Sequence, residues 1–331
     1  MDPLRPALTW TLCAAAMVHL VGCQRCQPAA AVGQRISGEL VIFHAGSLAV
    51  PLREAAREFG GRYPNVVVRM EAAGSRDSAR KICDLGRPCD VMASADYRVI
   101  EELLMPAHAD FNIRFAANEM AIAFTSRSRL AQEITSDNWY DLLLRPEVRF
   151  GRADPNRDPC GYRTEMLFQL AERHYGRPGL AAKLLAKDQR FIRPKETDLL
   201  ALLESGEIDY LFIYRSVIHQ HRLSMVALPD EVNLKSPALD ELYRTASAQV
   251  TGGAPGELVS RRGEAIVYSL TVCRNAPNPP AALAFVALLL GPEGRLIISR
   301  NGQQPLDPPI ADGWQRLPEA LKPLCRPVEK P

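Results

Sequence analysis

The sequence predicts an α/β fold, and three observations support this prediction. Short apolar runs rich in Val, Ile and Phe alternate from residue 39 onward with amphipathic stretches of helical spacing. The first five of these segments form a βαβαβ unit of about sixty residues. Apolar residues make up 47% and charged residues 24% of the 331-residue chain, which is typical of a soluble globular protein of about two domains.

The individual elements follow from apolar periodicity and from glycine stops. Gly60-Gly61 and Gly86 each come after the last apolar position of a helical pattern, where helices commonly end. The βαβαβ unit is predicted as a strand at 39–43, a helix at 48–59, a strand at 65–70, a helix at 76–85 and a strand at 89–93. Further strands are predicted at 120–124, 148–151, 210–214 and 265–273, and further helices at 162–174, 195–204, 280–290 and 291–298.

Charge excludes two classes of partner. The chain has 40 Lys and Arg against 38 Asp and Glu, without a basic block, and its pI is near 8.1. A nucleic-acid groove or a polybasic membrane patch needs a concentration of positive charge. We therefore expect no nucleic-acid partner.

The first residues resemble an export signal. The apolar stretch that ends at Val21 is too short to span a membrane comfortably, so residues 1–22 are predicted to be a signal peptide. Leu20-Val21-Gly22-Cys23 resembles a bacterial lipoprotein box, in which Cys23 becomes the lipidated first residue and the only membrane anchor. The alternative is an ordinary secretory signal with a chance cysteine. Residues 23–37 are predicted to be the tether between lipid and domain.

Cysteine usage leaves two interpretations open. An exported chain meets an oxidising compartment, so Cys83 and Cys89, on either side of a Gly-Arg-Pro turn, could close a small disulfide. Two buried thiols are the equal alternative. Cys160 and Cys273 stand alone in the sequence.

Small polar residues gather where strands run into helices. A helix N-terminus offers unpaired N–H groups to an anion, and in open α/β sheets such ends converge on one crevice. The four junctions are His44-Ala45-Gly46-Ser47, Ala72-Ala73-Gly74-Ser75, the segment 154–162 around Asp158, Pro159 and Cys160, and Tyr214-Arg215-Ser216. Each has an ordinary alternative: Ser47, Ser75 and Asp158 as helix caps, Glu196 as an acidic residue at a helix start, and Tyr214 as packing. The repeated Ala-Gly-Ser turn favours a shared crevice.

Motifs of enzymes and metal sites are weak or missing. No GxSxG, HExxH, Walker or GxGxxG pattern falls at a strand-to-helix junction. His219-Gln220-His221 does not place its histidines on one helix face, so a surface pair is the better interpretation. An exported hydrolase using Ser47 with His44 is a distant alternative, because no acidic partner is evident. We expect a protein that is not an enzyme.

Six motifs carry a resemblance to a known family. They are HAGSL at 44–48, EAAGSRDSARKICDLG at 71–86, DVMASADY at 90–97, DPNRDPCGYRT at 154–164, LLALLESGEIDYLFIYRSV at 199–217 and FVALLLGPEGRLIISRNGQQPL at 285–306. With these motifs the chain resembles the extracytoplasmic substrate-binding proteins of molybdate/tungstate uptake transporters, particularly the tungstate-binding branch first seen in archaea. The chain departs from the family in its Cys83/Cys89 pair and in a short connection before Lys195.

The resemblance implies a two-lobed periplasmic-binding-protein fold of type II, whose α/β lobes are joined by two crossing strands and close on a ligand in the cleft between them. The crossings are expected near 118–124 and 265–272, so that lobe 1 comprises residues 38–117 plus 273–331 and lobe 2 residues 118–272. Carried over by position, the residues expected to hold an oxyanion are Gly46, Ser47, Ser75, Asp158, Pro159, Cys160, Glu196 and Tyr214.

The presence of two carboxylates, Asp158 and Glu196, in a site for an anion needs a physical explanation. A carboxylate ~4 Å from a dianion, at an effective dielectric of ~20, would cost about 8 kcal/mol. Asp158 and Glu196 therefore lie outside the site, are protonated, or bond to the positive central metal. The tungstate branch resembles the last case, in which two carboxylates expand a tetrahedral oxyanion toward six-coordination. Glu204 and Glu207 are the substitutes if Glu196 is misplaced.

The resemblance thus implies a monomeric, lipid-anchored receptor without a cofactor. It would capture tungstate or molybdate on the periplasmic or extracellular side of the cell membrane. It would then deliver the ion to an ABC permease driven by a cytoplasmic ATPase. A receptor for sulfate, phosphate or ferric iron is the alternative on the same fold.

Overall fold

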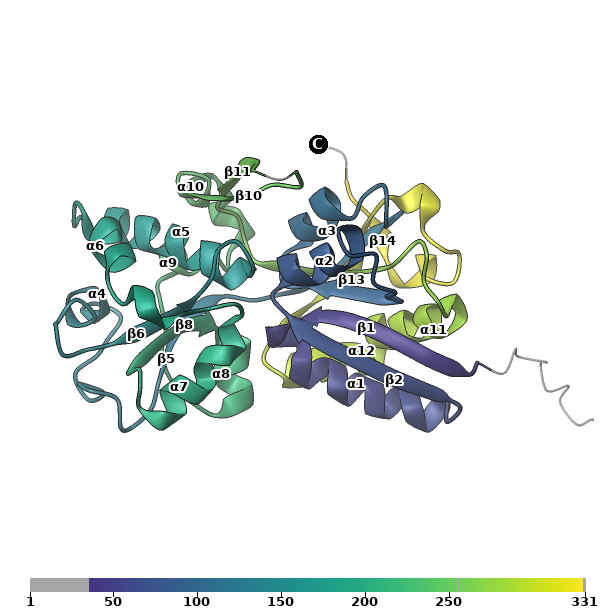
Figure 1. The fold of residues 1–331 in the computed structure, drawn as a ribbon, viewed down its shortest axis with the longest axis horizontal. Coiled ribbons are helices and arrows are strands. Elements are labelled where there is room, and N and C mark those ends of the chain that lie inside the picture. The colour runs from purple at the N-terminus through teal and green to yellow at the C-terminus, as the bar shows by residue number, and fades with distance from the viewer. Residues whose placement is uncertain (1–35, 255, 330–331) are drawn as a thin grey trace, which may run out of the picture. The chain divides into compact units, whose positions relative to one another are not determined.

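The computed structural model of the chain describes residues 36–254 and 256–329. The predicted signal peptide at 1–22, the predicted lipid-attachment residue Cys23 and nearly all of the tether lie outside these described residues. The described residues, from Ile36 onward, form one compact unit. Within it, most of the described strands form two mixed sheets, one in each of two lobes, and the remaining two form a separate hairpin (Figure 1).

The first lobe is built on a seven-stranded sheet with the order β14-β13-β4-β12-β3-β1-β2. Its strands are β1 (Gly38–Ala45), β2 (Val66–Ala73), β3 (Val91–Ser94), β4 (Asn112–Ala117), β12 (Val267–Val272), β13 (Gln304–Asp312) and β14 (Arg326–Pro327). Its helices are α1 (Ala49–Arg62), α2 (Ser75–Cys83), α3 (Tyr97–Leu103), α11 (Pro279–Leu290) and α12 (Pro292–Arg300). In Figure 1, α1 and α12 lie below this sheet, while α2 and α3 lie above it.

The second lobe is built on a five-stranded sheet with the order β7-β6-β8-β5-β9, beside a separate hairpin of β10 and β11. Its strands are β5 (Met120–Phe124), β6 (Phe150–Ala153), β7 (Ile192–Arg193), β8 (Tyr210–Tyr214), β9 (Ser224–Val226), β10 (Ser247–Thr251) and β11 (Leu258–Arg262). Its helices are α4 (Trp139–Leu142), α5 (Pro159–His174), α6 (Leu180–Ala186), α7 (Leu200–Ser205), α8 (Arg215–His221), α9 (Asp230–Asn233) and α10 (Asp240–Tyr243).

The βαβαβ unit predicted from the sequence is confirmed. β1 pairs in parallel with both β2 and β3, so the first strand lies between the other two. All four residues of β3 are buried, because a strand covered by helices on both faces is apolar on both sides. The carboxyl ends of these strands meet at one edge of the sheet, and the turns that begin at Gly46 and Ser75 start there.

The chain passes between the two sheets at two places. The first is where β4 ends and β5 begins, on either side of Asn118. The second precedes β12, whose residues Val267–Val272 pair with both β3 and β4. By strand pairing these residues belong with the first lobe, whereas residues up to 272 were assigned to the second. The apolar run at 265–273 predicts a strand but carries no information about which sheet the strand joins.

Several segments differ from the prediction. α1 continues through Gly60 and Gly61, because the buried Phe59 and the bond from Tyr63 N to the Phe59 carbonyl at 2.8 Å hold its last turn. A glycine in a helix costs roughly 1 kcal/mol, which such packing offsets. The helix predicted at 195–204 is divided into a 3-10 turn at Glu196–Leu199, called η3, and α7. The β10–β11 hairpin is absent from the prediction.

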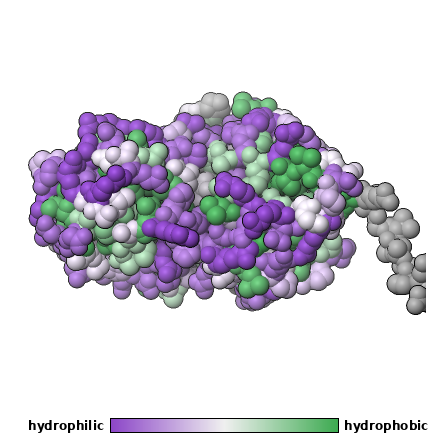
Figure 2. All heavy atoms as spheres, turned by 90° about the horizontal axis from the view of Figure 1, so that it is seen from below, coloured by the Kyte–Doolittle hydropathy of each residue, from purple (hydrophilic) through white to green (hydrophobic). Residues whose placement is uncertain are grey.

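The surface offers no extended apolar face in the view of Figure 2, where hydrophobic residues form separate patches among hydrophilic ones. The exposed large hydrophobic side chains lie on different elements and are Val67, Leu85, Met225, Leu258 and Leu296. Among the described residues, no single helix has the length and apolar character to cross a membrane. α11 and α12 satisfy both criteria only together, and they are bent by 65°.

Candidate functional site

Asp158 caps α5 at the junction after β6. One of its carboxylate oxygens accepts a hydrogen bond from the Cys160 N–H at 2.8 Å, which is the capping role that the sequence allowed. The other oxygen accepts from the backbone N–H of Glu196 at 3.0 Å. Asp158 is 2% exposed. It therefore both caps α5 and fixes the position of Glu196 beside the helix start.

Glu196 carries a buried carboxylate without a hydrogen-bond partner in the described part of the chain. It begins η3 and is 1% exposed. Neither Oε1 nor Oε2 has a hydrogen-bond partner among the described residues. A buried charge without a partner costs several kcal/mol unless it is neutralised. The predicted substitutes Glu204 and Glu207 are both exposed, so Glu196 is the glutamate that belongs to this cluster.

Gly46 of the first lobe lies against the Glu196 carboxylate. A Cβ at Gly46 would lie 3.1 Å from each carboxylate oxygen and 2.8 Å from Thr197 Oγ1. Only glycine allows this close approach of the 3-10 turn Gly46–Leu48, called η1. In the same turn, Ser47 Oγ accepts a hydrogen bond from the Tyr268 hydroxyl at 3.0 Å. The Ser47 hydroxyl proton therefore remains free to be donated to a ligand.

Ser75 repeats this arrangement at the start of α2. Its Oγ accepts a hydrogen bond from the Ala95 N–H at 3.0 Å, so its hydroxyl proton is also free. Gly74, just before it, packs so closely that a Cβ there would lie 2.2 Å from the Arg157 carbonyl oxygen. The alternative in which the two serines are ordinary helix caps is not supported. Ala45 and Gly74 occupy the cap positions of η1 and α2, and no side chain caps either turn.

Pro159, Cys160 and Tyr214 are buried beside Asp158. Pro159 is the first residue of α5, and the Cys160 thiol donates to the Phe212 carbonyl at 3.6 Å, toward β8. Tyr214, at the end of β8, accepts a hydrogen bond from Arg163 Nη1 at 2.9 Å, so its hydroxyl proton is free like those of the serines. Of the three, Tyr214 is the residue whose side-chain donor is not already used within the described part of the chain, because the Cys160 thiol donates to Phe212.

Arg163 is a site residue that the sequence reasoning missed. It lies on α5, is 3% exposed, donates to the Ala95 carbonyl at 2.7 Å and pairs with Asp96 at 3.3 Å. Because Ala95 and Asp96 belong to the first lobe, this guanidinium joins the lobes and adds a buried positive charge. An arginine at a helical position surrounded by apolar residues was the signal that could have found it.

Tyr268 and Asn118 connect the cluster to the crossings between the lobes. Asn118 Nδ2 donates to the Tyr268 hydroxyl and to Ser216 Oγ, both at 2.8 Å. Tyr268 in turn donates to Ser47. A continuous chain of hydrogen bonds therefore runs from η1 of the first lobe to α8 of the second.

Burial shifts the pKa of several titratable groups near the site, and two of them bear on its chemistry. The pKa of Asp158 is raised well above its ordinary value, first by burial and then by the neighbouring Glu196 carboxylate. The pKa of His44 is lowered to about 4, mainly by burial, so this imidazole is neutral. His44 Nδ1 lies 2.8 Å from the Ala45 carbonyl oxygen, whereas the partner of the Ser47 hydroxyl is Tyr268. The structure therefore does not bring together the Ser47–His44 pair that a hydrolase would need.

Two arginines of α2 in the first lobe form hydrogen bonds to the second lobe. Arg76 Nε donates to the Asn156 carbonyl at 3.2 Å, and Arg76 Nη2 donates to the Thr251 carbonyl. Arg80 Nη2 donates to Thr251 Oγ1 at 2.7 Å and to the Gly252 carbonyl at 3.0 Å. The helix that begins at Ser75 thus holds the loop before Asp158 and the end of β10 together.

The β10–β11 hairpin also reaches the first lobe beyond α2. In Figure 1 it lies above the region where the two lobes meet. Arg261 of β11 pairs with Glu102, and Glu264 just after β11 accepts from the Tyr97 hydroxyl at 2.8 Å. We call this hairpin the strap, because it belongs to the second lobe and is bound to α2 and α3 of the first.

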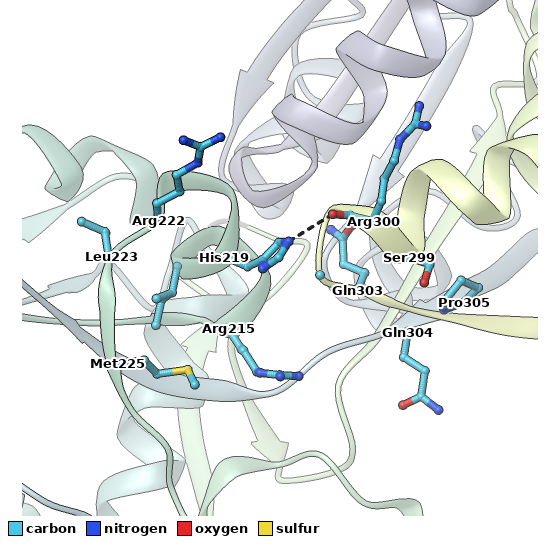
Figure 3. A pocket seen from close by; sticks show the side chains of 12 residues that line it. Arg215, His219, Arg222, Leu223, Met225, Ser299, Arg300, Gln303, Gln304 and Pro305 are labelled. Carbon is cyan, nitrogen blue, oxygen red and sulfur yellow. Dashed lines mark hydrogen bonds between the residues drawn. The ribbon is translucent and has the colours of Figure 1, made fainter.

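A cavity of about 960 Å³ lies outside this cluster, between α8 and the end of α12 (Figure 3). It is lined by Arg215, His219, Arg222 and Arg300, and His219 Nε2 lies 3.1 Å from the Arg300 carbonyl oxygen. None of the predicted oxyanion-binding residues lines it. His219 and His221 are both exposed, as expected of a surface pair. Among the described residues, no group of three or more His, Cys, Asp or Glu side chains could hold a metal ion.

The arrangement is suited to enclosing a small ligand where the lobes touch. The first lobe supplies the hydroxyl donors of Ser47 and Ser75. The second lobe supplies the hydroxyl of Tyr214 and the carboxylates of Asp158 and Glu196. Two α/β lobes with such a site between them define a solute-binding protein, the receptor class that serves ABC transporters. Comparison with known proteins supports this class. Residues 40–304 match the family described as bacterial extracellular solute-binding protein.

Individual relatives agree. An uncharacterized solute-binding protein of Petrotoga mobilis is 49% identical over 292 residues, covering 88% of this chain and 91% of that protein. The molybdate/tungstate-binding protein WtpA of Pyrococcus abyssi is 41% identical over 320 residues, with the same coverage of 88% and 91%. The periplasmic molybdate-binding protein of Azotobacter vinelandii shares the fold, with a TM-score of 0.58 at 18% identity over 80% of this chain and 98% of that one.

The chain therefore belongs to the extracellular solute-binding proteins of ABC transporters, which act outside the cytoplasm and are receptors and not enzymes. The α/β fold with two lobes, expected from the sequence, is confirmed.

Proposed function

We propose that this receptor binds tungstate or molybdate, and that Asp158 and Glu196 bond to the metal centre of the oxyanion. The observation that carries the proposal is the buried Glu196 carboxylate, whose two oxygens have no hydrogen-bond partner in the described part of the chain. A positive centre supplied by the ligand is what such a carboxylate lacks.

Charge arithmetic explains why the metal has to be the partner. Two carboxylates facing only the oxygens of a dianion would repel it by several kcal/mol each. Bonding to the metal turns that repulsion into attraction, because hard carboxylate oxygens suit a high-valent metal. A sulfur or phosphorus centre is too small to take two further ligands, so sulfate and phosphate would suffer the repulsion without the compensation.

The remaining groups fit the oxygens of such a ligand. The free hydroxyl protons of Ser47, Ser75 and Tyr214 are donors, and the starts of η1, α2 and α5 add backbone N–H groups. Gly46 leaves room for the Glu196 carboxylate, which would lie next to the ligand. Pro159 and Cys160 contribute backbone groups and packing. The name of the Pyrococcus relative, a molybdate/tungstate-binding protein, supports the same ligand.

Titration calorimetry with tungstate tests the proposal on Glu196→Gln and Asp158→Asn, with Glu207→Gln as the matched control. Glu207 is an exposed glutamate on the same lobe. We expect roughly hundredfold weaker binding in the first two variants, since an amide oxygen is a poorer ligand for the metal, and no change in the control.

Opposite outcomes have clear meanings. Stronger binding by the amides would show that the carboxylates only repel the ligand. Equal competition by sulfate would favour the receptor for another ion. X-ray absorption that counts four short oxygens and no longer pair would contradict six-coordination.

The membrane and transporter partners complete the proposal. The receptor is attached as a monomer through lipid on Cys23 and delivers its cargo to an ABC permease with a cytoplasmic ATPase. Detergent partitioning of Cys23→Ser tests the anchor, because stable retention at the membrane requires acyl chains. A variant that still partitions with the detergent phase would contradict it.

A further inference from the structure

Cys89 and Cys273 lie together in the first lobe although they are far apart in the chain. Both line one cavity of about 250 Å³. Both also belong to one small apolar cluster with Phe43 and Ile82, and they are 3% and 6% exposed. The two cysteines that stand apart in the sequence are therefore neighbours in the fold.

Strand pairing produces this neighbourhood. β12 runs antiparallel to β3 with Val272 opposite Val91, and the Cys273 N–H donates to the Asp90 carbonyl at 2.9 Å. Cys89 is the residue just before Asp90, so it lies diagonally across from Cys273 and not directly opposite it. The shared cavity and the shared apolar cluster bring the two side chains together at this end of the strand pair.

The surroundings of the thiols favour Cys273 over Cys83 as the partner of Cys89. Burial raises the pKa of Cys89 well above its ordinary value, and the neighbouring Cys273 thiol raises it further. Cys83 instead donates to Asp84 Oδ1 at 3.0 Å, and burial and that aspartate raise its pKa to about 12. Cys83, Cys89 and Cys273 are all free thiols in this structure, so it contains neither the small disulfide considered from the sequence nor a bond between Cys89 and Cys273.

We propose that Cys89 and Cys273 form a disulfide in the exported protein. The two thiols lose two protons and two electrons to an exogenous disulfide, such as that of a thiol oxidase or of oxidised glutathione, which is reduced to two thiols as the Cys89–Cys273 bond forms. Solute-binding proteins act outside the cytoplasm, where such oxidants keep disulfides formed.

The position of the bond gives it a structural effect. It joins the start of β3 to the end of β12. β3 leads into Ala95, the partner of Ser75, and β12 carries Tyr268, the partner of Ser47. A crosslink between distant parts of a chain also restricts the unfolded state. The bond therefore strengthens the lobe that presents both serines, whichever ion the receptor binds.

Peptide mapping tests the proposal on the wild-type protein, both as exported with its thiols blocked at lysis and after refolding in a glutathione redox buffer. We expect a non-reducing digest to contain the Cys89 peptide linked to the Cys273 peptide, and reduction to separate them. A Cys89 peptide that is free in both samples, or linked to Cys83, would overturn the proposal.

Cys273→Ser and Cys83→Ser form a matched pair of variants. We expect Cys273→Ser to lower the Tm by roughly 5–10 °C, and a reductant to lower the Tm of the wild type and of Cys83→Ser by a similar amount. Reductant should leave the Tm of Cys273→Ser unchanged. An equal response of Cys273→Ser to the reductant would contradict the pairing. Tungstate affinity does not enter either readout, so this test is independent of the proposed function.

Discussion

Gly46 and Glu196 depend on each other although they belong to different lobes. The absence of a side chain at Gly46 is what allows η1 to lie against the Glu196 carboxylate. Asp158 holds the backbone of Glu196 from the other side. A glycine, a helix cap and a buried acid thus act as one unit, and a change at any of them alters the site.

Gly46→Ala should weaken tungstate binding by about tenfold or more, because the added methyl group would lie 2.8 Å from Thr197 Oγ1 and force the lobes apart. Gly61→Ala is the matched control, since a Cβ at that helical glycine meets nothing within 4 Å. The control should bind normally and gain about 0.5–1 kcal/mol in the free energy of unfolding. Calorimetry and urea unfolding measure both effects, and normal binding by Gly46→Ala would show that the lobes have room there.

At the scale of elements, α2 has two functions. Its first residue, Ser75, presents a hydroxyl to the site, while Arg76 and Arg80 along the same helix bind backbone carbonyls of the second lobe. A helix is rigid, so on the proposed function its first turn stays beside the ligand while these arginines bind the second lobe. Ligand capture and closure of the lobes would then be coupled through one element.

Arg80→Ala should increase the rate of tungstate release by about tenfold with little change in the rate of binding, since it removes charge-assisted bonds formed only when the lobes are closed. Arg69→Ala provides the control, because Arg69 pairs at 2.7 Å with Glu39 inside the first lobe. Stopped-flow mixing of the free receptor with tungstate measures the rate of binding, and displacement of bound tungstate by excess molybdate measures the rate of release. Identical release from the two variants would remove the strap from the closing mechanism.

Elements with strong local patterns were predicted well, and those set by tertiary contacts were not. The strands at 120–124 and 210–214 match β5 and β8 residue for residue, because both are short apolar runs between polar residues. β3 begins two residues later than predicted, since Asp90 uses its side chain to bind the Val41 N–H. The β10–β11 hairpin escaped prediction because its strands are mostly polar, and its position depends on partners in the first lobe.

Whole-molecule stability depends on pH through groups that the fold buries. His44 has its pKa lowered to about 4 against an ordinary value of 6.5. Between these values the unfolded chain binds a proton that the folded protein does not, so acidification favours unfolding. Asp158 acts in the opposite direction, because its raised pKa lets the folded protein keep a proton that the unfolded chain loses.

His44→Gln separates the two contributions, since glutamine is neutral at every pH in this range. On acidification from pH 7 to pH 4.5, the wild type should lose about 2–3 kcal/mol more in its free energy of unfolding than the variant does. Urea unfolding at the two pH values gives the difference. Equal losses would show that His44 is protonated without cost in the folded protein.

The sequence indicated residues that the fold places close together, whereas the contacts between them could not be predicted. The strand-to-helix junctions indicated Ser47, Ser75 and Asp158, because the ends of parallel strands share one edge of a sheet. Arg163 was missed, since its partners Ala95 and Asp96 come from the other lobe and no local pattern indicates them. Whether a serine hydroxyl accepts or donates a hydrogen bond likewise depends on its partner. The sequence does not show that Tyr268 lies beside Ser47 or that Ala95 lies beside Ser75.

The Glu196 carboxylate, which has no hydrogen-bond partner among the described residues, bears on how much ATP the transporter uses for each ion that it moves. On the proposed function, lobes that close without cargo leave this charge buried and uncompensated, at a cost of about 3 kcal/mol. Such a cost shifts the balance between closed and open empty receptors by roughly a hundredfold toward the open form. A permease that recognises the closed form would then rarely be triggered by an empty receptor, and its ATPase would rarely hydrolyse ATP without moving an ion.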